Sequence, residues 1–122
     1  DKEGLVYIAD TWNQRIQVMT KDSSGTYLPL VNWDIVAWFG QSLDNKPYLA
    51  VDDNGNLYAT DPEGYRVLHF TSQGMFVNFF GDYGTGPEGF NLPTGIISDG
   101  NGGVWIADAG NGRIMHFTIP SP

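Results

Sequence analysis

The sequence predicts one all-β domain made of three copies of a repeat, and three observations support this. The chain has 122 residues, with 16 Gly, 7 Pro, 4 Trp, 6 Tyr and 7 Phe, a composition typical of short strands joined by tight turns. Three segments align without gaps, and apolar residues within them alternate with the period of two that strands require. No segment has a convincing helical period.

The charge balance argues against several classes of partner. With 6 basic and 14 acidic residues the net charge is −8, whereas nucleic-acid binding and docking on anionic membranes need clustered Lys and Arg. No apolar run reaches the length of a spanning helix, so we expect no direct membrane insertion in this segment. The chain has no Cys, which removes disulfides, thiolate metal sites and a Cys nucleophile, and leaves the compartment open.

The repeat units begin at Asp1, Asp52 and Asp99, and their starts are 51 and 47 residues apart. They read DKEGLVYIADTWNQRIQVMT, DDNGNLYATDPEGYRVLHFT and DGNGGVWIADAGNGRIMHFT. Each contains a Gly three residues after its first Asp, a second Asp, and an Arg five residues beyond that second Asp. The resulting Asp and Arg positions are Asp10 and Arg15, Asp61 and Arg66, and Asp108 and Arg113. The spacing is that of propeller blades.

Each element is predicted from its local pattern. Alternating apolar residues define the strands, and Gly- and Asn-rich turns such as 53–56 and 100–103 separate them. We expect ten strands, near residues 6–8, 15–19, 27–39, 48–52, 57–59, 66–70, 74–80, 95–99, 104–106 and 113–117. Lettered outward from the innermost strand, a, their order is b-c-d, a-b-c-d, a-b-c. The blades are predicted at about 1–40, 41–81 and 82–122.

These residues identify a family resemblance. The pattern Asp, turn Gly, Tyr-x-Ala-Asp, x-x-Asn-x-Arg-Ile-x-x-Phe resembles the NHL repeat, and the stretch 81–99 looks like an NHL inter-blade segment. The second unit departs from the pattern because it has Tyr65 before its Arg and lacks the usual Asn, and 22–38 is longer than a standard fourth strand. The resemblance implies four-stranded blades of a β-propeller, often six-bladed, and a scaffold rather than a reaction.

A finer resemblance concerns residues 39–70. This segment is similar to the C-terminal NHL region of certain bacterial membrane-embedded glycosyltransferases of the dolichyl-phosphate-mannose class. That resemblance implies an extracytoplasmic location for a fragment that does not contain the active site.

Three patterns have both a chemical and a structural interpretation. Residues 84–89 match GxGxxG, but no helix-forming run comes after them, so we interpret them as an inter-blade loop. Residues 52–56 resemble the start of a calcium loop without its closing Glu, which favours a hairpin turn over the alternative, a calcium site. His69 and His116 hold equivalent repeat positions, so packing between blades is expected for both.

The six residues of the Asp and Arg pairs are interpreted as structural. A carboxylate can act in acid–base chemistry, but three copies at one repeat position are typical of a structural device. We therefore predict no catalytic residue and no metal ligand. Because loops on a rigid scaffold carry variable chemistry, the ligand-binding candidates are loop residues: Trp12, Asn13, Glu63, Tyr65, Asp82, Tyr83 and Asn111.

The sequence therefore favours a non-enzymatic binding or scaffold module for a protein or glycan, without a cofactor. The alternative is a propeller enzyme, a lyase or lactone hydrolase with a metal in its channel, as the family resemblance implies. Three blades do not close a ring, so we expect a homo-oligomer or a longer chain that completes it. An open arc is expected to expose the Ile16/Val18 face of the first blade and the Ile114/His116 face of the last.

Overall fold

The computed structural model describes residues 1–42 and 44–120. Within them the regular structure consists of strands and four single 3-10 turns, and no helix is long and apolar enough to cross a membrane. The strands are β1 Val6–Asp10, β2 Arg15–Lys21, β3 Tyr27–Asp34, β4 Leu49–Val51, β5 Leu57–Asp61, β6 Arg66–Phe70, β7 Phe76–Phe80, β8 Asp82–Tyr83, β9 Gly89–Phe90, β10 Pro93–Ser98, β11 Gly103–Asp108 and β12 Arg113–Thr118. The turns are η1 Thr11–Asn13, η2 Val36–Trp38, η3 Pro62–Gly64 and η4 Ala109–Asn111.

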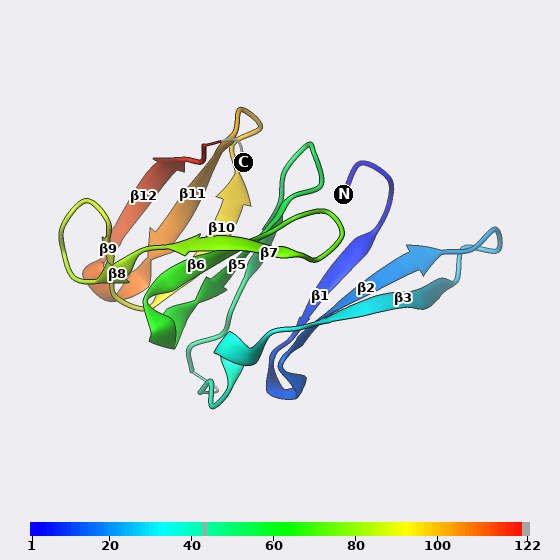
Figure 1. Ribbon diagram of the computed structural model, residues 1–122, viewed down its shortest axis with the longest axis horizontal. Coiled ribbons are helices and arrows are strands. Elements are labelled where there is room, and N and C mark those ends of the chain that lie inside the picture. The colour runs from blue at the N-terminus through cyan, green and yellow to red at the C-terminus, as the bar shows by residue number, and fades with distance from the viewer. Residues whose placement is uncertain (43, 121–122) are drawn as a thin grey trace.

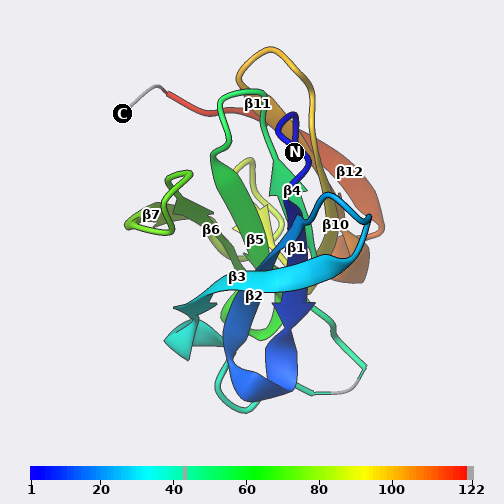
Figure 2. The same ribbon diagram turned by 90° about the vertical axis from the view of Figure 1, so that its right-hand side faces the viewer.

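Three antiparallel sheets stand side by side like the leaves of a fan (Figure 1). Their strand orders are β1-β2-β3, β4-β5-β6-β7 and β10-β11-β12. The turned view in Figure 2 shows the β1-β2-β3 sheet in front of the other two. The all-β prediction and the predicted strand order within each sheet are confirmed.

One hairpin is repeated in all three sheets, with a 3-10 turn between its strands. The repeat Asp at the end of one strand lies directly opposite the repeat Arg at the start of the next in every copy. The residue before each Arg has a left-handed backbone, with φ of 53° at Gln14, 57° at Tyr65 and 62° at Gly112. This conformation suits Gly, so the two other residues occupy it at some cost in strain.

Each sheet has an Asp face, which carries the repeat Asp, and an opposite face. The first core cluster joins the opposite face of the first sheet to the Asp face of the second, with Ile16 and Val18 packed near Leu57 and Leu68. The second cluster repeats this arrangement between the second and third sheets. It contains Tyr58, Val67, Phe90, Val104 and Ile106. Both interfaces therefore join equivalent faces of neighbouring repeats.

This regularity corrects one expectation. The sequence pattern places Ile16 and Val18 on an exposed face, but they are 0% and 2% exposed because they form the interface with the second sheet. The exposed face of the first sheet is instead its Asp face, where Val6 and Ile8 are about two fifths exposed. Ile114, 66% exposed, lies on the opposite face of the third sheet as expected.

Two further differences concern the connections. A short parallel pair, β8 with β9, lies within the long connection between the second and third sheets, and the sequence pattern did not indicate it. The strand expected over 27–39 ends at Asp34, and its last residues form η2 instead. Trp38 of that turn is buried and donates its indole N–H to the carbonyl oxygen of Thr60 at 3.2 Å.

The two histidines, equivalent by repeat, have different surroundings. His69 is buried and stacks on Tyr58, with ring centroids 4.6 Å apart, and neither ring nitrogen has a hydrogen-bond partner among the described residues. Burial lowers the pKa of His69. The expectation that His116 packs between blades is wrong for the described chain, because His116 lies on the exposed opposite face and pairs with Asp99 at 2.7 Å.

Candidate functional site

The repeat Asp and Arg residues form short ion pairs at one end of each hairpin. The Arg Nε lies 2.7 Å from the carboxylate in the first sheet and 2.8 Å in the second and third. The carboxylates of Asp61 and Asp108 are buried, whereas that of Asp10 is partly exposed. Hydrogen bonds from Arg15, and then from Asn13, lower the pKa of Asp10.

Both oxygens of every repeat carboxylate accept hydrogen bonds, and the second donor differs between repeats. In the first sheet the Asn13 side chain donates to both oxygens of Asp10. In the third, the backbone N–H of Asn91 donates to Oδ1 of Asp108 at 2.7 Å, and Asn111 donates at 2.8 Å to the oxygen that also binds Arg113. In the second sheet Gln41 reaches in from the preceding connection and donates to Asp61 at 2.8 Å. The carboxylates therefore fix neighbouring loops and present no free oxygen for proton transfer.

The third repeat Arg holds the glycine-rich loop at 84–89. Its two terminal nitrogens donate to the carbonyl oxygens of Thr85, Gly86 and Gly89 at 2.8–2.9 Å. This loop leads into β9 instead of a helix, so it lacks the helix N-terminus that a dinucleotide pyrophosphate requires. The interpretation of 84–89 as an inter-blade loop agrees with these contacts.

We call the end of the fan that carries η1, η3 and η4 the loop face. The connecting residues 39–42, 44–48 and 81–92 adjoin it, and in Figure 1 the three turns lie at the lower end of the molecule. All seven candidate ligand-binding residues lie on it or on these connections: Trp12, Asn13, Glu63, Tyr65, Asp82, Tyr83 and Asn111.

Trp12 is a large apolar side chain of the loop face that is 71% exposed. It lines two hollows. The larger, about 420 Å³, is also bounded by Ser42, Lys46 and Pro47, and the smaller, about 170 Å³, by Trp38 and others. Trp12 therefore offers an open ring with hollow surface around it.

A second aromatic group lies on another part of the loop face. The rings of Tyr65 and Tyr83 are 4.8 Å apart, centroid to centroid, and inclined by 59°. Asn111 donates to the carbonyl oxygen of Gly84 at 2.9 Å, next to Tyr83 in sequence. Asp82 is exposed, and its carboxylate accepts the backbone N–H of Tyr83.

The predicted residues are therefore not one cluster. Tyr65 and Tyr83 meet directly, whereas Asn13 and Asn111 are engaged with repeat carboxylates. Glu63 accepts a long hydrogen bond of 3.4 Å from Asn45. Sequence reasoning did not connect Trp38 with Trp12, because only the fold brings η2 next to η1.

The fit to a metal ion is poor in the part of the chain that is described. That part contains no group of three or more His, Asp or Glu side chains able to hold an ion. In the turn at 52–56, Asp52 already accepts the backbone N–H groups of Asn54 and Asn56, both at 2.9 Å. These bonds are those of a hairpin turn.

Comparison with known proteins identifies the repeat. NHL repeat-containing protein 3 from Homo sapiens is 39% identical over 77 residues, which is 61% of this chain and 22% of that protein. The Mus musculus protein of the same name matches equally. The chain thus spans about a fifth of the length of these curated relatives. No protein-family model matches.

Solved structures show the same fold. An auxiliary nutrient binding protein from Bacteroides thetaiotaomicron superposes with a TM-score of 0.62 and 17% identity, over 94% of this chain and 35% of that one. Virginiamycin B lyase from Staphylococcus aureus superposes with a TM-score of 0.60 and 18% identity, over 98% of this chain and 39% of that one. The β-propeller domain of Cps50 from Myceliophteria thermophila superposes with a TM-score of 0.60 and 11% identity, over 88% of this chain and 35% of that one. The chain is accordingly a series of NHL repeats folded as part of a β-propeller.

Proposed function

We propose that the chain is a binding module whose loop face holds a protein or glycan partner. The observation that supports this most is the exposed ring of Trp12 between two hollows. An exposed aromatic ring supplies a large contact area for little loss of side-chain entropy, and it stacks equally well on a sugar face or on a peptide.

Rigid anchoring of the loops supports the same proposal. The repeat ion pairs fix the base of each turn, and Arg113 fixes the long loop beside η4 through three carbonyl oxygens. A surface that is already ordered loses less entropy on binding.

Tyr65 adds a further argument. Its left-handed backbone costs about 1 kcal/mol in a residue with a Cβ, whereas Gly112 holds the equivalent place without strain. The ring of Tyr65 contacts Tyr83 in return. Backbone strain tends to occur at functional sites, so the strained backbone of Tyr65 supports a role of its ring in binding.

Two matched tryptophan variants test the proposal. Trp12→Ala removes the ring on the loop face, and Trp105→Ala removes a ring that is 46% exposed on the third sheet, away from it. Glycan arrays and a displayed peptide library should yield ligands that bind the wild type and Trp105→Ala but lose at least tenfold in affinity with Trp12→Ala. If Trp12→Ala has no effect on any ligand found, the loop face is not the site.

The enzyme alternative has its own test. A channel metal would need donors on the inner strands, yet β4 and β10 carry no His, Asp or Glu. We derive no reaction step from such an ion. Elemental analysis of the purified protein should find less than a tenth of a metal equivalent per chain, and a stoichiometric ion would favour the enzyme. The glycosyltransferase resemblance and the extracytoplasmic location stay predictions.

A further inference from the structure

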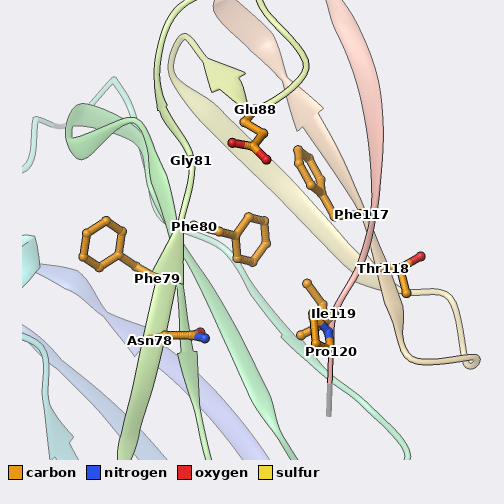
Figure 3. A pocket seen from close by; sticks show the side chains of 9 residues that line it. All are labelled: Asn78, Phe79, Phe80, Gly81, Glu88, Phe117, Thr118, Ile119 and Pro120. Carbon is orange, nitrogen blue, oxygen red and sulfur yellow. The ribbon is translucent and has the colours of Figure 1, made fainter. Parts of the chain in front are cut away.

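The smaller hollow beside Trp12 is formed by two consecutive repeats. Its lining residues lie in 11–14, between β1 and β2, and in 38–41, after β3. The cleft between β7 and the residues after β12 is different, because the described chain ends beside it (Figure 3). The repeat equivalents of Trp12 are Glu63 and Gly110, and both are exposed although another sheet precedes each of their sheets. The exposure of Trp12 therefore follows from its place in the repeat.

Gln41 contributes an amide oxygen to the lining of this hollow. Its Nε2 donates to Oδ1 of Asp61 at 2.8 Å, and because a carboxylate only accepts hydrogen bonds, this contact fixes which end of the amide binds Asp61. The other end, Oε1, is buried and has no hydrogen-bond partner among residues 1–42 and 44–120. Buried acceptors in proteins nearly always have a donor. This oxygen therefore indicates a donor that the described residues do not supply.

The remaining lining groups are neutral. They are the rings of Trp12 and Trp38, the amide of Gln14, the hydroxyl of Thr11 and the backbone of Gly40. In the described part of the lining there is no carboxylate, ammonium or guanidinium group to compensate a charge on a ligand. A hydroxyl group both donates and accepts hydrogen bonds, so a ring that carries several hydroxyls matches a mixture of amides and a hydroxyl. The lining therefore favours a neutral sugar over a charged side chain.

The volume of the hollow corresponds to a single ring. It is about 170 Å³, and a protein cavity of about 150 Å³ is known to hold benzene. Thr11 and Trp12 also line the larger hollow of about 420 Å³, so the two hollows share a wall. A ligand of several linked rings fits this arrangement, with one ring in the smaller hollow and the next in the larger.

The interface between the second and third sheets shows that the repeat does not require these amides. Tyr65 holds the place of Gln14 there, and its ring packs on Tyr83. The repeat carboxylate of the third sheet accepts the backbone N–H of Asn91 at 2.7 Å, whereas that of the second accepts the side chain of Gln41. The two side-chain amides are thus particular to the hollow beside Trp12.

We propose that this hollow binds the terminal ring of a neutral oligosaccharide. The ring stacks on Trp12, one hydroxyl donates to Oε1 of Gln41, and other hydroxyls bind the side chains of Gln14 and Thr11. The next sugar lies in the larger hollow. This inference rests on the proposed function, because it names the class of ligand that the same loop face binds.

The probes are neutral trisaccharides of glucose, mannose, galactose and N-acetylglucosamine, titrated into the whole chain in a calorimeter. At least one should bind saturably, and its affinity should fall at least tenfold with Trp12→Ala and less than twofold with Trp105→Ala. If no trisaccharide needs Trp12 but displayed peptides do, the inference is wrong and the proposed function stands. If neither class of ligand needs Trp12, both are wrong.

A glycine substitution tests the hollow without harming the fold. Gln14 has a left-handed φ of 53°, and Gly112 holds the equivalent place, so Gln14→Gly should not lower Tm. It should weaken the trisaccharide about fivefold. Gln73→Gly makes the same exchange at an exposed residue of the turn between β6 and β7, and it should change the affinity less than twofold. Equal effects of the two variants would overturn the placement of the ring.

Deoxy sugars test the hydrogen bond to Gln41. Among the monodeoxy versions of the trisaccharide that binds, one should bind the wild type at least tenfold more weakly than the parent sugar. Gln41→Met keeps a side chain of similar length and removes Oε1, so the parent and that deoxy sugar should bind this variant within twofold of each other. Both sugars are compared on the same variant, so the lost bond to Asp61 affects them equally. A tenfold difference that persists with Gln41→Met would overturn the proposal, as would a series in which no deoxy sugar is weakened.

Discussion

The ion pair of Asp61 with Arg66 gives the sharpest test of how the repeats are stabilised. We expect Asp61→Ala and Arg66→Ala to destabilise the fold by similar amounts and to be non-additive. Asp61 is 1% exposed and accepts hydrogen bonds from Arg66 and Gln41 at 2.8 Å, so removing either charge leaves the other partly buried without its partner.

The expected loss for each single variant is about 3–5 kcal/mol, as for other broken buried pairs. The side chain of Arg66 is about a third exposed, so water partly solvates the charge that Asp61→Ala leaves without a partner. The loss for that variant should therefore lie near the lower end of this range. The free energy of unfolding of a domain of this size is roughly 5–15 kcal/mol in total. Each variant should therefore lower Tm by about 10–20 °C. The double variant should recover part of the loss, with a coupling of about 1–3 kcal/mol.

Urea unfolding of the four proteins, followed by tryptophan emission, measures this cycle. The same cycle on Asp10 and Arg15 serves as a control, because their side chains are 21% and 34% exposed and the coupling should be clearly smaller. Small additive losses at Asp61 and Arg66 would refute the reasoning, because they would mean that the two side chains are independent. Equal coupling in both repeats would show that burial does not set the energy.

The net charge, the buried histidine and the exposed faces each give a further expectation. The chain should not shift RNA or DNA in an electrophoretic assay at physiological salt, because its net charge is −8, and micromolar salt-sensitive binding would contradict this. Because burial lowers the pKa of His69 below its ordinary value of 6.5, the unfolded chain takes up this proton first, and stability should fall as pH drops below about 6.5. His69→Phe should flatten that part of a plot of Tm against pH, and an unchanged plot would contradict the assignment. For the isolated chain of 122 residues, we expect copies to associate head to tail through the Ile8 and Ile114 faces. Light scattering should then give monomers for Ile8→Asp and for Ile114→Asp, and a dimer when the two variants are mixed. A monodisperse mass near 13.4 kDa for the wild type at high concentration would contradict self-association.

The repeat made most of the fold predictable. The alternation of apolar residues located the strands. The repeat Asp and Arg are five residues apart in every unit, as Asp61 and Arg66 are in the second, and this fixed spacing indicated a local pair from the sequence alone. Alternation does not say, however, which face of a strand meets a neighbour. The sequence pattern therefore puts Ile16 and Val18 on an exposed face. Their repeat equivalents, Ile114 and His116, lie on the same face of the third sheet, and that face is buried in the first sheet but exposed in the third.

The candidate site was less predictable because its parts meet only in the folded chain. Trp12 and Trp38 line one hollow through a contact between two turns that are distant in sequence.

The grip of Arg113 on the loop at 84–89 has a consequence for how the chain opens. Residues 82–91 follow β7 after a single residue, Gly81, but they are hydrogen-bonded to side chains of the third sheet. Arg113 donates to the carbonyl oxygens of Thr85, Gly86 and Gly89, and the backbone N–H of Asn91 donates to Asp108. When the third sheet opens, these contacts are lost together, and the loop should be released with it rather than with the second sheet. Native-state hydrogen exchange should therefore place the boundary between two cooperative units near Gly81, well inside a connection that is continuous along the chain.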